Sequence, residues 1–210
     1  MNYITEYVTQ IRDGKIITSA RVRRVFERLQ AEIENPVGPY IFDEKKAAKP
    51  IEFIERFCRH SKGEWAGQHI KLELFQKAFI SALFGFVNKE TGLRKYKEAM
   101  FYVARKNGKS TMLAGIALYC LIADGEAGAE VYSVATKKDQ AKIVFDEICN
   151  MVKQSPELAQ ACKKRKSDLY FGYNMSKAQP LGKNSDTLDG LNSSLVIIDE
   201  LHAVKDRNLY

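Results

Sequence analysis

The chain has 210 residues, of which 45% are hydrophobic and 28% are charged. This length and composition are typical of one well-cored globular domain, alone or with a small appendage, and exclude a disordered or fibrous chain. The longest mainly apolar runs are shorter than the ~18 residues that a membrane-spanning helix needs, and the first residues lack the layout of a signal peptide. We therefore expect a protein that is not secreted and has no membrane partner.

The cysteines and the net charge narrow the classes of function further. Four cysteines are scattered along the chain and none forms a Cys-x-x-Cys pair, which argues against a zinc knuckle or a disulfide scaffold and fits a reducing cytoplasm. The formal net charge is +7. Such an excess is compatible with a DNA or RNA partner, although many basic proteins bind no nucleic acid.

The first third of the chain is predicted to be helical. Apolar residues between Val22 and Ile33 recur at helical spacing, and the same segment together with the preceding residue contains Arg21, Arg23, Arg24 and Arg28. We interpret these arginines as a solvated basic face, with a DNA-contacting face as the alternative. Residues 35–39 contain two prolines and a glycine and predict a break. A second helix is expected to begin at Pro50, and a third to cover residues 72–84.

From residue 98 onward, strands and helices are expected to alternate. Residues 99–103 predict a short apolar strand, and residues 112–122 the helix that follows it. Further strands are predicted at residues 130–134 and 195–198. Thr136 and Asp139 resemble a capping box that would open a helix with apolar residues from Ala141 to Val152. This pattern predicts an α/β domain with a mainly parallel sheet.

Between the first strand and its helix lies the sequence Gly108-Lys109-Ser110, the C-terminal half of a phosphate-binding P-loop (Walker A motif). Backbone N–H groups at a helix N-terminus favour anions. Lys109 would reach the β- and γ-phosphates, and the Ser110 hydroxyl would bind Mg²⁺. The usual first glycine is replaced by Val103. The alternative is a surface turn, but the strand before the loop and the helix after it favour the P-loop.

The strand at residues 195–198 ends in Asp199-Glu200, an acidic pair of the Walker B type. Open α/β sheets bind their ligands at the C-terminal ends of their strands. Asp199 would hold Mg²⁺ through water, and Glu200 would orient and polarise the attacking water. An acid-capped turn is the alternative. Together with the P-loop, this pair predicts a nucleoside triphosphatase.

These motifs resemble one family, the large terminase subunit of tailed bacteriophages, which is an ATP-driven DNA-packaging motor. The resemblance extends over most of the chain and rests on the segments at residues 51–58, 71–77, 104–111, 187–192 and 199–203. The P-loop of the family also lacks the first glycine and has an arginine at the position of Arg105. The departure at Val103 therefore agrees with the resemblance.

The resemblance implies residue roles and cofactors, namely ATP and Mg²⁺. Arg105 resembles the arginine that senses or stabilises the γ-phosphate and would act in catalysis with Lys109 and Glu200. Gln76 resembles a glutamine that reads adenine; from the residues alone it would be an exposed helix residue. The nucleotide-binding loop would comprise Arg105, Lys106, Asn107, Gly108, Lys109, Ser110 and Thr111.

The resemblance also implies an organisation and partners. We expect a helical N-terminal region at residues 1–60 and a P-loop ATPase domain at residues 61–210. The chain stops soon after the acidic pair, so we expect an incomplete sheet, no nuclease domain, and weak or absent turnover by this piece alone. The implied function is translocation of double-stranded viral DNA into the procapsid in the cytoplasm of the infected bacterial host. The implied partners are double-stranded DNA, the portal protein, the small terminase subunit and, for the full-length protein, further copies in a ring.

Two other functions remain open from the sequence. Asp199-Glu200-Leu201-His202 is similar to the acidic box of helicase-like P-loop ATPases. Alternatively, the chain is a truncated, non-catalytic fragment that binds nucleotide, DNA or packaging partners. The basic run at residues 163–166 is interpreted as solvated, with contact to DNA phosphates as its alternative.

Overall fold

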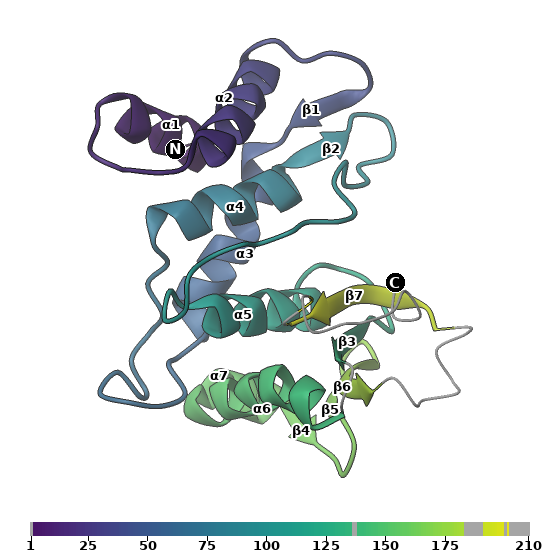
Figure 1. Cartoon of the computed structure of the whole chain (residues 1–210). Coiled ribbons are helices and arrows are strands. Elements are labelled where there is room, and N and C mark those ends of the chain that lie inside the picture. Colours follow the sequence, from purple (N-terminus) through teal and green to yellow (C-terminus); the bar gives the residue numbers. More distant parts are fainter. Residues whose placement is uncertain (1, 136–137, 183–190, 200, 202–210) are drawn as a thin grey trace. The chain divides into compact units, whose positions relative to one another are not determined.

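The computed structural model describes residues 2–135, 138–182, 191–199 and 201. The chain forms two compact units, which are described separately (Figure 1). The first unit comprises residues 1–52 and 71–102, and the second comprises residues 53–70 and 103–210. The predicted division into residues 1–60 and 61–210 stays a prediction. None of the described helices is long and apolar enough to cross a membrane.

The first unit is mainly helical. Asn2 and Ser19 accept backbone hydrogen bonds and so cap the first two helices. Side chains from these helices, together with Ala78 and Phe86, form a buried core. The elements of this unit are α1 (Tyr3–Arg12), α2 (Ala20–Glu34), most of α3 (Glu44–Phe57), α4 (Leu74–Gly85) and the antiparallel strands β1 (Tyr40–Phe42) and β2 (Phe86–Asn88).

The second unit is an α/β layer with a five-stranded sheet in the order β4-β5-β6-β3-β7. Strand β3 pairs in parallel with β6 and β7, whereas β4–β5 and β5–β6 are antiparallel. Helices α5 and α6 lie beside one another against the sheet (Figure 1). The elements are α5 (Lys109–Ile122), β3 (Glu130–Ala135), α6 (Lys138–Gln154), α7 (Pro156–Ala161), β4 (Cys162–Lys164), β5 (Leu169–Phe171), β6 (Ser176–Gly182) and β7 (Ser193–Ile198).

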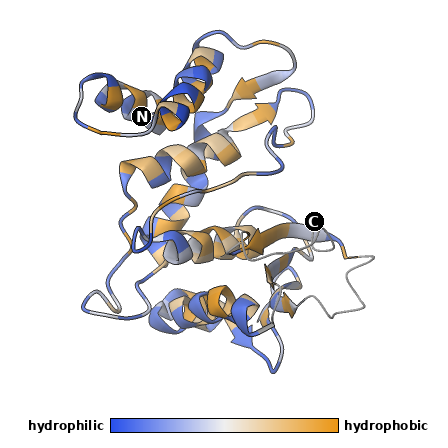
Figure 2. Cartoon of the chain, in the orientation of Figure 1, coloured by the Kyte–Doolittle hydropathy of each residue, from blue (hydrophilic) through white to orange (hydrophobic). Residues whose placement is uncertain are grey.

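Helix α5 is the central helix of the second unit. Nearly every side chain from Met112 to Leu121 is buried, and the helix is coloured largely as hydrophobic in Figure 2. It packs closely on the last residues of α3, because Gly115 leaves room for the fully buried Ile54. The polar residues of its first turn, Lys109, Ser110 and Thr111, are only half-buried. The helix therefore has an apolar body and a polar start.

The predicted α/β class is confirmed, as are most of the predicted elements. The helices expected at residues 22–33, 72–84 and 112–122 correspond to α2, α4 and α5. The strands expected at residues 130–134 and 195–198 correspond to β3 and β7. Helix α6 buries the apolar face that was predicted for it. Thr136 of the predicted capping box lies outside the described residues.

One predicted boundary was wrong. Helix α3 begins at Glu44, so Pro50 lies inside the helix and does not open it. Asp43 explains the earlier start, because its Oδ1 atom accepts the backbone N–H groups of Lys45 and Lys46 at 2.9 and 3.0 Å. Because this cap starts the helix before Pro50, the proline lies in the helix interior. A proline in that position typically costs about 3 kcal/mol of helix stability.

The strand predicted at residues 99–103 is absent, since the structure has no regular element there. Met100 and Tyr102 are exposed, at 75% and 97%. Phe101 packs instead on α4, with its ring centroid 4.7 Å from that of Phe79 and 6.3 Å from that of Phe75. Phe101, one of the apolar residues that predicted a buried strand, thus packs in a cluster of aromatic rings in the first unit.

Candidate functional site

The loop before α5 has a strained, self-bonded conformation. Lys106 and Gly108 both have a positive φ, at 66° and 70°. For Lys106, which has a Cβ atom, this conformation is uncommon. The Asn107 side-chain amide donates to the carbonyl oxygens of Ala104 and Arg105 at 3.1 and 3.2 Å. Left-handed residues at close spacing turn backbone N–H groups toward a common concave side, an arrangement that binds anions. Strain of this kind is often found at functional sites.

Helix α5 begins directly after this loop. Gly108 accepts the first intrahelical hydrogen bond from Met112 at 2.9 Å and, as a glycine, offers no side-chain cap. The first turn contains no acidic residue. The N-terminal N–H groups and the helix dipole therefore favour a negatively charged ligand at this end.

The structure brings two of the predicted site residues together. The Lys109 Nζ atom lies 2.7 Å from the Asp199 Oδ1 atom, and the two side chains are 30% and 17% exposed. Lys109 is the first residue of α5, and Asp199 directly follows β7. The parallel pairing of β7 with β3 carries Asp199 to the C-terminal edge of the sheet. An ammonium and a carboxylate thus meet beside an anion-binding helix start.

Oxygen ligands are available here for a magnesium ion. Mg²⁺ is held in nucleotide sites by one or two carboxylate or hydroxyl oxygens together with phosphates and water. Asp199 offers a carboxylate beside Lys109, and Ser110 offers a hydroxyl in the same first turn of α5. The donor set fits a phosphate-bound Mg²⁺. Within the described ranges, no group of three His, Cys, Asp or Glu side chains forms a separate metal site.

The other predicted site residues are distributed as follows. Arg105, Lys106, Asn107 and Gly108 are exposed, whereas Ser110 and Thr111 are half-buried. Glu200 lies outside the described residues, as do residues 187–190 and His202. The placement of these residues relative to bound nucleotide stays a prediction.

Gln76 has a local role that the sequence did not indicate. It is buried, at 6% exposed, and its Oε1 atom accepts the backbone N–H of Glu73 at 3.0 Å. The two residues form a capping box at the start of α4. The expectation of an exposed helix residue was therefore wrong, and the adenine-reading role stays a prediction.

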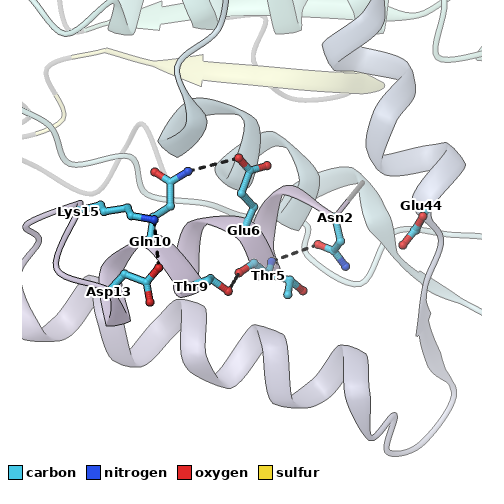
Figure 3. A pocket seen from close by; sticks show the side chains of 8 residues that line it. All are labelled: Asn2, Thr5, Glu6, Thr9, Gln10, Asp13, Lys15 and Glu44. Carbon is cyan, nitrogen blue, oxygen red and sulfur yellow. Dashed lines mark hydrogen bonds and ion pairs between the residues drawn. The ribbon is translucent and has the colours of Figure 1, made fainter.

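An open polar depression of about 580 Å³ lies along α1 in the first unit (Figure 3). None of the predicted site residues lines it. Its polar groups form short-range contacts, such as the hydrogen bond of 3.3 Å from Gln10 to Glu6 and the ion pair of 3.3 Å between Lys15 and Asp13. These contacts are typical of a solvated helix surface, and we assign no site to this depression.

Comparison with known proteins gives a consistent result. A family model described as "Terminase large subunit, ATPase domain" matches residues 74–210. The large terminase subunit of Enterobacteria phage HK97 is 32% identical over 164 residues, which cover 76% of this chain and 31% of that protein. The large terminase subunit of Lactococcus phage SK1 is 27% identical over 214 residues, which cover 96% of this chain and 38% of that protein.

A solved structure is also similar. The crystal structure of the HK97 bacteriophage large terminase matches with a TM-score of 0.63 at 31% identity, over 76% of this chain and 32% of that chain. The chain thus spans about a third of the length of these relatives.

Proposed function

Because the chain belongs to the family of terminase large subunit ATPase domains, we propose that it is the ATPase part of a DNA-packaging motor. In this function the chain supplies the ATP site, and ATP hydrolysis by the whole motor drives double-stranded viral DNA into the procapsid. The observation that supports the proposal most directly is the contact between Lys109 and Asp199 at the start of α5. The motifs of the chain and its similarity to terminases favour this function over that of a helicase-like ATPase.

The proposed roles follow from the charges at this site. Lys109 and the N–H groups of the first turn of α5 bind the β- and γ-phosphates. Ser110 and Asp199 hold Mg²⁺, which neutralises charge on the phosphates. Glu200 accepts a proton from the attacking water and orients it. Arg105 stabilises charge that develops on the γ-phosphate, a role that can contribute about 10³–10⁵ in rate.

Further proposals concern specificity and partners. Gln76 reads adenine through its side-chain amide, which has the donor and acceptor needed for the N6/N7 edge. The motor acts on double-stranded DNA with the portal protein, the small terminase subunit and other copies in a ring. It works in the cytoplasm of the infected host.

The first test is a titration of the purified chain with ATP, with and without Mg²⁺. We expect Lys109→Ala to weaken binding by about 10- to 100-fold, since it removes a charge-assisted contact worth about 1.5–3 kcal/mol. The matched control is Lys142→Ala, which removes an exposed lysine from an ion pair of 3.5 Å on α6. Equal binding by both variants and the unaltered chain would refute the proposed site.

A second measurement separates binding from turnover. Phosphate release is followed at saturating ATP for the unaltered chain and for Lys109→Ala. We expect weak or absent turnover together with magnesium-dependent binding. Robust turnover that is lost in Lys109→Ala would show that residues 1–210 suffice for catalysis. Absence of nucleotide binding by a folded chain would contradict the proposal for this chain.

A further inference from the structure

Three arginines lie on the outer side of α2. Successive residues of an α-helix are about 100° apart, so Arg21, Arg24 and Arg28 fall within an arc of about 60°. This arc lies opposite the buried Phe26 and Leu29. We call these three residues the arginine face. All three are exposed, and hydrophilic and hydrophobic residues alternate along the helix in Figure 2.

The acidic residues of α2 make their contacts outside the arginine face, although Glu32 lies one helical turn from Arg28. Glu27 contacts Arg23 at 3.0 Å and Arg12 at 3.8 Å. Glu32 pairs with Lys95, and Glu34 accepts a hydrogen bond of 2.7 Å from Gln30. Within the part of the chain that the structure describes, no ion pair involves the arginine face. The helix therefore presents three formal positive charges on one side.

The spacing of these charges matches a nucleic-acid backbone. At 1.5 Å rise per residue, Arg21 and Arg28 are about 10.5 Å apart along the helix axis. Phosphates of one DNA strand advance about 3.4 Å per nucleotide along the duplex, so three steps cover about 10 Å. A guanidinium group can also bind phosphate oxygens through two N–H groups at once. Exposed apolar area between the charges is limited to Val25, which is 48% exposed.

We propose that the arginine face of α2 binds the phosphate backbone of double-stranded DNA. The inference rests on the proposed function, in which duplex DNA is the substrate, and adds a contact surface on the first unit of the chain. Binding through phosphates is independent of base sequence and falls steeply with salt.

The experiment measures the affinity of the full chain for a labelled 30-base-pair duplex by fluorescence anisotropy at several salt concentrations. The test variant changes all three residues of the arginine face to glutamine. Each phosphate contact contributes about 0.9 to the slope of log K against log salt. We expect the slope to decrease in magnitude by about 2.7, equally for duplexes of different sequence. Changing the same residues to lysine should retain most of the slope.

A charge-matched variant serves as the control. It combines Lys45→Gln, Lys142→Gln and Lys153→Gln, which are exposed lysines outside α2, and has the same formal net charge as the test variant. We expect it to keep the slope of the unaltered chain. Thermal unfolding confirms that both variants are folded.

Several results would overturn the inference. An unchanged slope in the test variant would place the contacts elsewhere. The same conclusion would follow from equal losses in the test variant and the charge-matched control, or from a loss confined to that control. Absence of duplex binding by the unaltered chain would overturn it as well. If poly-L-glutamate competes as well as DNA at equal charge, the face binds acidic polypeptides instead. ATP binding is measured on the same samples, so that a failure of this inference can be distinguished from a failure of the proposed ATP site at Lys109.

Discussion

Replacement of Gly115 by alanine tests how closely α5 must approach α3. An added Cβ atom would lie 2.9 Å from Cγ1, 3.1 Å from Cδ1 and 3.2 Å from Cγ2 of Ile54. Ile54 is fully buried and its side chain is branched at Cβ, so its rotamers are restricted. The helix or the isoleucine must therefore move.

The expected magnitude is the difference between two effects. Overpacking of a dense core costs typically about 1–3 kcal/mol, whereas alanine in a helix interior is about 1 kcal/mol more favourable than glycine. We expect Gly115→Ala to destabilise the chain by about 0–2 kcal/mol. In a chain that already has Ile54→Ala, the obstructing atoms are absent. There the same substitution should stabilise the chain by about 1 kcal/mol.

The assay is urea denaturation of the unaltered chain, both single variants and the double variant. The coupling between the two positions should be about 1–3 kcal/mol and of the sign that favours the double variant. An equal effect of Gly115→Ala in both backgrounds would refute the reasoning. Because α5 begins with Lys109, ATP affinity measured on the same variants reports whether a shift of the helix reaches its first turn.

Three further predictions concern other residues. Gln76→Glu keeps a capping oxygen but loses the amide donor, so it should weaken ATP binding relative to GTP binding while the variant unfolds near the normal temperature. Gln76→Ala should weaken ATP binding in the same way and also lose about 1 kcal/mol of stability. Equal unfolding temperatures of Gln76→Ala and the unaltered chain would contradict the capping role. Hydrogen bonds from a lysine and a tyrosine lower the pKa of Glu130 below 4.5, so its contribution to stability is present above that pH and lost below it. Glu130→Gln should flatten the acid side of the stability profile, and an unchanged profile would refute this. Burial raises the pKa of Cys58 to about 12 and those of Cys149 and Cys162 to about 11. At pH 8, iodoacetamide should therefore label these thiols far more slowly in the folded chain than in urea. Rapid labelling of the folded chain, detected by mass spectrometry, would contradict this prediction.

Much of the α/β architecture could be predicted because periodicity and apolar content are local signals. The helical spacing from Ala141 to Val152 predicted α6, and continuous apolar runs predicted β3 and β7. Strands β4, β5 and β6 were missed. The segment of β6 contains a proline and a glycine, and β4 contains two lysines. Their strand conformation depends on pairing partners, such as Val131 with Ala178, and not on local preference.

The candidate site was predictable in its residue types but not in its contacts. Lys109 and Asp199 could be named from their motifs, although 90 positions separate them in the sequence. Their direct ion pair depends on the register of β7 beside β3. The left-handed φ of Lys106 and the capping role of Gln76 also depend on local geometry. Neither has a signal that one sequence could reveal.

The contact between Lys109 and Asp199 has a thermodynamic consequence on the proposed roles. A phosphate that draws the ammonium group away from the carboxylate leaves the carboxylate to attract a divalent cation more strongly. ATP and Mg²⁺ would therefore increase each other's affinity, and linkage requires the two factors to be equal. Because the ion pair already holds the two charges side by side, ligand binding exchanges their partners and need not first bring the charges together.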